Sequence, residues 1–239
     1  MRGLFLCYTI FMFDQMILID KPENMTSFGV VARVRRILSE KAGRKIKVGH
    51  TGTLDPFATG LLILMSGKNT KKCQEFLKLD KRYEATIKLG FTSTTGDPEG
   101  ELIEHKNYSI PTPDEVKKVV QSFIGEITQT LPRFSAIKID GRRAYDLARK
   151  GQEVEMPKRT VKIYEITILE YDFPYLKIDC KVSSGTYIRT LGEDIGESLG
   201  TGAYLTALRR TEIGPYNISD SLPLDTWMSQ NSKIPLVKS

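Results

Sequence analysis

The feature that most constrains this chain is a glycine- and threonine-rich stretch that runs directly into an apolar segment, KVGHTGTLDPFATGLLILMSG at residues 47–67. The apolar run from Leu61 to Met65 is typical of a buried strand, and the residues before it are typical of a shaped loop. Glycine permits close approach of the backbone, and Pro56 restricts Asp55 to extended geometry. The sequence therefore predicts a loop that holds the Asp55 carboxylate in one place, either beside a ligand or as the cap of a short turn that begins at Pro56.

Two nucleotide-binding loops do not fit this sequence. A phosphate-binding loop needs a glycine, four residues and then Gly-Lys-Ser/Thr. Before Gly67-Lys68, Leu62 stands where the first glycine should be, and Asn69 follows. No G-x-G-x-x-G pattern follows a predicted strand either, so we expect no nucleotide cofactor.

The charge of the chain favours a polyanionic partner. The formal net charge is +6 and the pI is about 9.1, which favours nucleic acid over a small anion. Cys7, Cys73 and Cys180 are far apart, and with two histidines they suggest neither a disulfide framework nor a metal site. The apolar run within residues 1–15 is too short to span a bilayer and lacks a cleavage site for a signal peptide. We expect a cytoplasmic protein without a membrane partner.

The rest of the chain alternates predicted strands with predicted helices. Thr112, Pro113 and Glu115 form the clearest helix start, with a cap, a first-turn proline and a third-position acid. Strands are expected from Met16 and over Leu61–Met65, Tyr83–Leu89, Val161–Glu170 and Leu176–Val182. Helices are expected from Thr26 or Ser27 to about Gly43, after Thr70, from Thr112 to Gly125, and around Ile188, Leu191 and Ile195. We predict one α+β domain over residues 16–224, with residues 1–15 as an N-terminal extension and 225–239 as a tail.

The loop at residues 49–56 closely resembles the signature loop of the TruB family of tRNA pseudouridine synthases, G-H-T-G-x-L-D-P. The resemblance implies the pseudouridine-synthase fold, with a mostly antiparallel mixed sheet, and Asp55 as the essential catalytic residue. Tyr83 stands in the family's Lys-x-Tyr, whose tyrosine stacks on the target base; a strand tyrosine alone is more typical of a core. SSGTYIR at residues 183–189 matches the family's S-x-G-T-Y-I-R, whose arginine pairs with the catalytic aspartate. The resemblance thus assigns that role to Arg189, which by itself would be expected at the surface.

Residues 129–151 resemble the family's RNA-gripping insertion. A turn is expected at residues 140–141, followed by a basic helix from Arg142 to Lys150. Two residues depart from the family's pattern: Leu131 replaces a usual proline and Phe134 a usual tyrosine. The phenylalanine keeps the ring and loses the hydroxyl's hydrogen bond.

Further residues carry expected RNA or uracil contacts. In GTGAYLTALRRTEIGPY at residues 200–216, the resemblance implies that Leu208 helps wall the uracil pocket. His50 is expected to open the RNA or to shape the loop. Many family members carry a further RNA-binding domain of the PUA type, for which we expect no room here. The expected substrate-binding set is Lys21, His50, Lys81, Arg142, Arg143 and Leu208.

The resemblance implies isomerisation of the T-loop uridine of tRNA, U55, to pseudouridine without any cofactor. Asp55 would act as nucleophile or base, and Arg189 would hold it ionised. The target base would be flipped out of its stack and held against Tyr83. We expect the T arm of tRNA as the partner and a monomeric protein. One alternative is a non-catalytic RNA-binding module on the same scaffold, and another, an NTP-dependent enzyme, lacks its phosphate loop.

Overall fold

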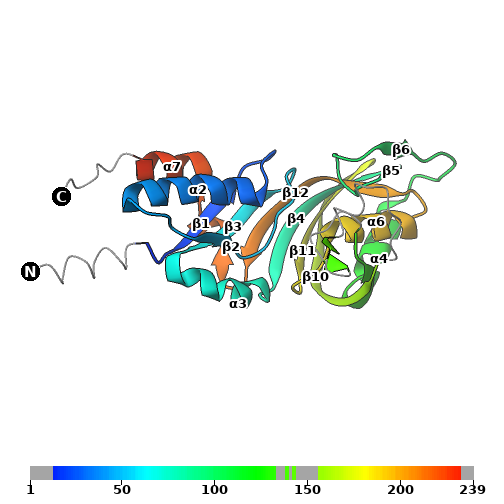
Figure 1. Cartoon of the computed structure of the whole chain (residues 1–239). Coiled ribbons are helices and arrows are strands. Elements are labelled where there is room, and N and C mark those ends of the chain that lie inside the picture. The colour runs from blue at the N-terminus through cyan, green and yellow to red at the C-terminus, as the bar shows by residue number, and fades with distance from the viewer. Residues whose placement is uncertain (1–12, 133–137, 140–141, 144–155, 233–239) are drawn as a thin grey trace, which may run out of the picture. The chain divides into compact units, whose positions relative to one another are not determined.

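The structure is a computed structural model that describes residues 13–132, 138–139, 142–143 and 156–232. The chain forms two compact units, the first made of Met1–Lys81 and Arg209–Ser239 and the second of Arg82–Leu208. Ten of the described strands belong to one mixed sheet, which five described helices flank (Figure 1). This arrangement confirms the predicted α+β class.

The first unit contains a sheet in the order β14-β1-β3-β12, with β2 paired to β3 and β13 to β12. Strand β1 is antiparallel to β3 and parallel to β14, whereas β3 and β12 are parallel. The elements are β1 (Met16–Lys21), α2 (Ser27–Ala42), β2 (Val48–His50), β3 (Thr59–Ser66), the 3-10 helix η1 (Gly67–Lys72), α3 (Cys73–Leu77), the end of β12 (Ala203–Ile213), β13 (Tyr216–Asn217), the 3-10 helix η2 (Ile218–Asp220), β14 (Leu222–Pro223) and α7 (Leu224–Ser232).

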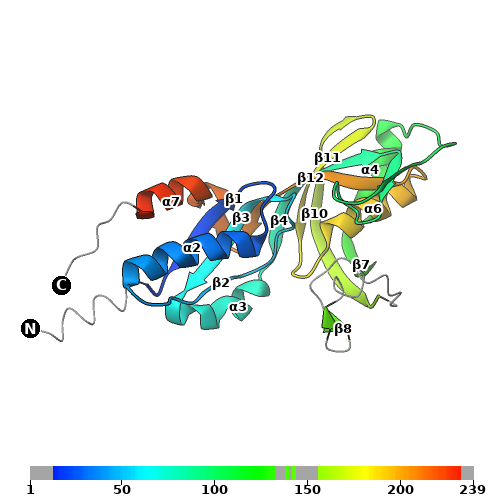
Figure 2. The same cartoon turned by 45° about the horizontal axis from the view of Figure 1, so that its top comes forward.

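The apolar run of β3 is buried on both of its faces. Leu62 and Leu64 pack in a cluster with residues of β1, α2 and α7, and the two helices lie side by side in both ribbon views (Figures 1 and 2). Leu61, Ile63 and Met65 point into a second cluster, which includes residues of α3 and β13. A strand covered on both sides reads as a continuous hydrophobic run, so this part of the prediction is confirmed.

Helix α2 begins and ends as predicted. The Thr26 side chain accepts a hydrogen bond from the backbone N–H of Gly29 at 2.9 Å, and Gly43 ends the helix in the left-handed conformation, with φ of 61°. A short helix, α3, follows Thr70 as expected, but Thr70 itself lies inside η1 and Leu77, the last residue of α3, is 37% exposed. One short turn does not present a full apolar stripe to the core.

Residues 13–15, which the sequence reasoning left outside the fold, pack against it. Phe13 is buried in the cluster under α2. Its carbonyl accepts a hydrogen bond from the Ser66 hydroxyl at 2.7 Å, and the Asp14 carboxylate accepts one from the Lys68 N–H at 2.8 Å. The start of this unit therefore includes residues before Met16.

The second unit contains the strand order β12-β4-β11-β10-β7. Strand β10 is antiparallel to both β11 and β7. Helix α4 packs against β10 and α6 against β7, and the two helices contact each other (Figure 2). The elements are β4 (Lys81–Leu89), β5 (Phe91–Ser93), β6 (Leu102–Glu104), α4 (Pro113–Ser122), β7 (Gly125–Thr130), β8 (Lys138–Ile139), β9 (Arg142–Arg143), β10 (Lys158–Asp172), β11 (Tyr175–Val182) and α6 (Ile188–Ser198).

Two predicted features of this unit are confirmed in detail. Strand β4 alternates buried and partly buried residues along its length. Helix α4 opens with a capping box in which the Thr112 hydroxyl accepts from the Glu115 N–H at 3.4 Å and the Glu115 carboxylate accepts from the Thr112 N–H at 2.7 Å.

The predicted basic helix from Arg142 is wrong at its start. Arg142 and Arg143 form β9, which pairs antiparallel with β8. In such a pair the backbone hydrogen bonds run from one strand to the other and not along a helix. Residues 144–150, the predicted turn at 140–141 and Phe134 lie outside the described residues. Leu131, the other departure from the family's pattern, is buried at the end of β7. Within the described ranges, no helix combines the length and the hydropathy needed to cross a bilayer.

Candidate active site

The loop that carries Asp55 joins β2 to β3 in the first unit. The backbone N–H of Ala58 donates to the Asp55 carbonyl at 3.1 Å, which closes the turn after the aspartate through the main chain. Gly52 and Gly60 have φ of 149° and 105°, values that side chains disfavour. No helix follows Asp55 before β3 begins at Thr59. The glycines therefore allow a compact excursion between two strands of the sheet.

Ser27, at the start of α2, fixes the residue directly before Asp55. Its hydroxyl accepts a hydrogen bond from the Leu54 N–H at 2.8 Å and donates one to the Leu54 carbonyl at 3.0 Å. Ser27 is buried, so both bonds are shielded from water. One side chain thus satisfies both main-chain groups of Leu54 and limits the positions open to its neighbour.

Lys21 and Lys81, both expected to contact RNA, are buried instead. The Lys21 ammonium donates to the carbonyls of Pro22, Met25 and Pro56, the last at 3.1 Å on the residue after Asp55. The Lys81 ammonium donates to the carbonyls of Leu77 and Leu79. Burial lowers the pKa of Lys81 to about 8, with a smaller contribution from nearby Arg210. Neither lysine offers an exposed ammonium in support of the expected RNA contact.

His50 lies at the start of the same loop and is partly buried. Its Nδ1 atom accepts a hydrogen bond from the Gly52 N–H at 3.4 Å. Burial, and then the positive charge of Arg210, hold the pKa of His50 below 6.5. The lowered pKa favours the neutral imidazole, which accepts the Gly52 hydrogen bond within the loop.

Arg189 is buried at the start of α6 in the second unit, which is not the surface position that an isolated helical arginine suggests. Its Nη1 atom donates to the Thr95 carbonyl at 2.7 Å and forms an ion pair with Asp97 at 3.2 Å. The other carboxylate oxygen of Asp97 accepts hydrogen bonds from the Thr95 hydroxyl and from the Glu99 N–H. Asp97 therefore fixes the guanidinium from a tightly bonded turn.

Asp97 is an ion-pair partner of Arg189 that sequence reasoning missed. Its segment, LGFTSTTGDPEG at residues 89–100, contains an acid followed by proline, a local signal that could have drawn attention to it. Gly96, directly before it, has φ of 72° and passes so close to Glu193 that an added Cβ would lie 2.8 Å from the carboxylate. Burial raises the pKa of Glu193 to about 7, against the opposing effect of Arg189. This carboxyl group therefore titrates near neutral pH beside the Arg189–Asp97 pair.

Tyr83 and Leu208 also belong to the second unit. Tyr83 lies in the buried row of β4 and is 8% exposed, while Leu208 of β12 is 7% exposed. An exposed fraction this small is compatible with a residue that lines a pocket and with a residue in the core. Their predicted contacts with the uracil stay predictions, as does the pairing of Asp55 in the first unit with Arg189 in the second.

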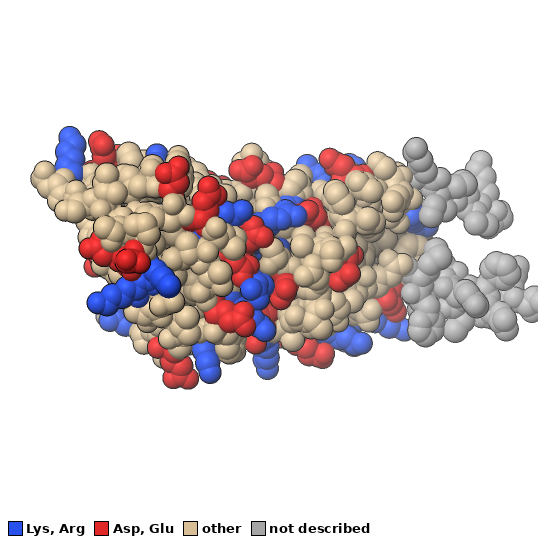
Figure 3. All heavy atoms as spheres, turned by 180° about the vertical axis from the view of Figure 1, so that it is seen from behind, with Lys and Arg blue, Asp and Glu red and all other residues tan. Residues whose placement is uncertain are grey.

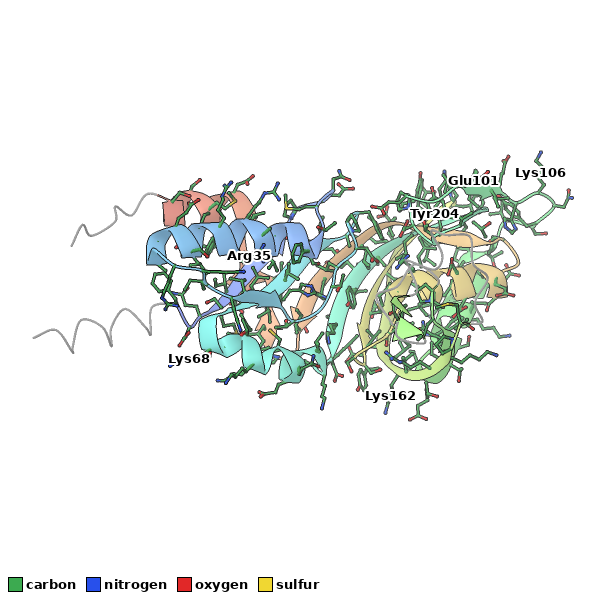
Figure 4. All side chains as sticks on the ribbon, viewed as in Figure 1. Arg35, Lys68, Glu101, Lys106, Lys162 and Tyr204 are labelled. Carbon is green, nitrogen blue, oxygen red and sulfur yellow. The ribbon has the colours of Figure 1, made fainter. Side chains whose placement is uncertain are left out.

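Charged residues of both signs are interspersed over the face shown in Figure 3. Each unit also carries cations beside exposed rings. Arg35 projects from α2, and its guanidinium carbon lies 5.6 Å from the centroid of the Phe28 ring (Figure 4). The ammonium of Lys162 in β10 lies 5.5 Å from the centroid of the Tyr164 ring. Such pairs suit contacts with phosphates and bases. Nowhere in the described part of the chain do three or more His, Cys, Asp or Glu side chains group as metal ligands.

Comparison with known proteins places this loop in a family. A model described as the TruB family pseudouridylate synthase N-terminal domain matches residues 35–188, and one described as the tRNA pseudouridylate synthase B C-terminal domain matches residues 189–230. Among curated relatives, tRNA pseudouridine synthase B of Phocaeicola vulgatus is 47% identical over 215 residues, covering 88% of this chain and 92% of that protein. The protein of the same name from Parabacteroides distasonis is 44% identical over 225 residues, covering 92% and 96%.

Solved structures show the same fold. A Cbf5-Nop10-Gar1 complex contains a chain that aligns with a TM-score of 0.71 and 31% identity over 92% of this chain and 56% of that chain. An H/ACA RNP bound to a substrate RNA containing 2'-deoxyuridine contains one that aligns with a TM-score of 0.68 and 29% identity. The chain thus spans about half of each of these structural relatives. From the family models and the curated relatives together, the chain belongs to the TruB family of pseudouridylate synthases.

Proposed function

We propose that this protein converts U55 in the T loop of tRNA to pseudouridine. The observation that carries the proposal is the complete loop at residues 49–56, in which Ser27 and Lys21 hold the backbone on both sides of Asp55. The relatives named tRNA pseudouridine synthase B support tRNA as the substrate. The net charge of +6 supports a polyanionic partner.

The reaction is an isomerisation and needs no external oxidant, reductant or group donor. The bond between ribose C1′ and uracil N1 breaks, a bond from C1′ to uracil C5 forms, the C5 proton is lost and N1 is protonated. Asp55 supplies the carboxylate that starts this exchange as nucleophile or base. A carboxylate on a backbone fixed at both neighbouring residues meets the reacting atoms with little reorganisation.

The resemblance to the TruB family assigns the remaining roles in the proposal. Arg189, oriented by Asp97, provides a positive charge that favours the ionised form of Asp55. Tyr83 provides the ring on which the flipped uracil stacks, and Leu208 an apolar wall. We further propose that the protein acts as a monomer in the cytoplasm, without metal or nucleotide.

The test is a cofactor-free incubation with a T-arm RNA hairpin, using the native protein and Asp55→Asn. We expect the native protein to convert the single loop uridine and the variant to bind the RNA without converting it. Tight binding of the hairpin without conversion by the native protein would instead favour a non-catalytic RNA-binding module. Equal conversion by Asp55→Asn would refute the role of the aspartate.

A further inference from the structure

Arg210, in β12 of the first unit, spans the two ends of the Asp55 loop. It is 1% exposed, and its guanidinium faces three main-chain carbonyl oxygens. Nη2 donates to the Gly52 carbonyl at 3.2 Å and Nη1 donates to the Thr53 carbonyl at 3.5 Å. Both carbonyls lie shortly before Asp55 in the chain. Nε donates to Leu61 at 2.8 Å, in the strand that follows the loop.

The backbone of Arg210 is fixed as firmly as its side chain. Arg210 stands opposite Gly60 in the parallel pairing of β12 with β3. Gly60 has φ of 105°, and an added Cβ would lie 2.3 Å from the Arg210 carbonyl oxygen. This close approach, which only glycine permits, places the guanidinium at a defined position beside the loop.

Among the described residues, no acid forms an ion pair with Arg210. Its neighbour Arg209, by contrast, is partly exposed, and its Nη2 atom pairs with Asp20 at 2.7 Å. A buried cation that has only carbonyl partners costs stability relative to an apolar side chain of the same size. Its position at the loop suggests a role that a purely structural apolar residue could not fill. Burial is the larger cause of the lowered pKa of both His50 and Lys81, and the charge of Arg210 adds to it.

We propose that Arg210 is a positioning residue for the reaction, because its guanidinium holds the carbonyls of Gly52, Thr53 and Leu61 and so fixes the loop that carries Asp55. The inference rests on the proposed function of that loop. The planar fork of arginine presents five N–H donors in a fixed geometry, whereas the flexible ammonium of lysine cannot face the same three carbonyls from one position. Loss of the fork should therefore release the loop even where the positive charge remains.

The experiment compares Arg210→Lys and Arg210→Met with Arg209→Lys, the same change at the neighbouring position. Three quantities are measured: the single-turnover rate at saturating T-arm hairpin, the Kd for the hairpin, and hydrogen exchange of a peptide covering residues 48–60. A misplacement of about 1 Å in an active site slows chemistry by about 100-fold. We expect a loss of about that size for Arg210→Met and about tenfold or more for Arg210→Lys, with Kd changed less than about threefold. Loop exchange should accelerate, while a peptide covering β11 should be unchanged.

Three outcomes would overturn the inference. The first is a native rate and native loop exchange in Arg210→Lys, or effects no larger than those of Arg209→Lys. The second is a rise in Kd that accounts for the whole loss of activity, because it would make Arg210 a substrate contact. The third is global unfolding of Arg210→Lys, which would assign the residue to general stability. Failure of the proposed function would look different. It would appear as no conversion by the native protein, or as full conversion by Asp55→Asn. Hydrogen exchange of residues 48–60 would still show whether Arg210 holds the loop.

Discussion

Replacing Ser27 with alanine should destabilise the first unit and slow catalysis, because the Ser27 hydroxyl bonds both main-chain groups of Leu54. The change removes two hydrogen bonds, of 2.8 and 3.0 Å, from a side chain that is 2% exposed. Each bond contributes about 1 kcal/mol net, and a buried polar group left without a partner costs about 1–3 kcal/mol. We expect the free energy of unfolding to fall by about 2–4 kcal/mol in total.

The assay is urea unfolding followed by circular dichroism, with Ser122→Ala as the matched control. The Ser122 hydroxyl donates to the Val119 carbonyl at 2.7 Å on an exposed helix face, so its loss should cost less than about 0.5 kcal/mol. Turnover of Ser27→Ala should fall about tenfold or more at temperatures where it remains folded, because Leu54 adjoins Asp55. A change in stability below about 0.5 kcal/mol for Ser27→Ala would refute the idea that this hydroxyl holds the loop.

Three further perturbations follow from described contacts. Gly60→Ala should leave the protein insoluble or severely destabilised, because the new Cβ would meet the Arg210 carbonyl oxygen at 2.3 Å; soluble expression and a native thermal midpoint would contradict this. Glu193→Gln should raise the thermal midpoint at pH 8 but not at pH 5. The pKa of Glu193 in the folded protein, about 7, lies above its ordinary value of 4.5, so the folded state holds this proton more tightly than the unfolded state. The folded protein therefore loses stability as the pH rises from about 4.5 through 7, and glutamine, which stays neutral, avoids that loss. An equal effect at both pH values would show that this carboxyl group does not titrate there. Thr112→Ala should cost about 1 kcal/mol through loss of the capping box, measured by thermal unfolding, and a neutral result would show that α4 does not depend on its cap.

The parts of the fold that local rules determine were predictable from the sequence. The run at 61–65 is apolar because β3 is buried on both faces, and the Thr112 box begins α4 because its hydrogen bonds are made within four residues. The regular alternation of β4 likewise follows from a single buried face. In each case the determining interactions lie close in sequence or follow one simple period.

The missed features depend on contacts between segments distant in sequence. Strand β12 was not predicted, because its centre holds Arg209 and Arg210 and an arginine is rarely buried without a known partner. The carbonyls that accept from Arg210 lie about 150 positions earlier in the chain. The ion pair of Asp97 with Arg189 and the three carbonyl partners of Lys21 were not predictable for the same reason, since a charged residue ordinarily indicates a solvated surface.

The candidate site was predictable only in part. Composition and spacing indicated a held carboxylate at Asp55 and excluded nucleotide loops, but chemistry entered through the resemblance of complete motifs. The backbone clamp of Ser27, Lys21 and Arg210 has no sequence signature, because a serine, a lysine and an arginine are individually common on surfaces. Only the fold brings them to one loop.

The most direct measurement is nucleotide-resolution mapping of pseudouridine in a full-length tRNA transcript after incubation with the native protein and with Asp55→Asn. RNA binding by both proteins is measured in the same preparations. We predict pseudouridine at position 55 of the T loop with the native protein, and bound but unmodified RNA with the variant. Modification at other uridines only, or at position 55 by both proteins, would contradict the proposed specificity or the proposed role of Asp55.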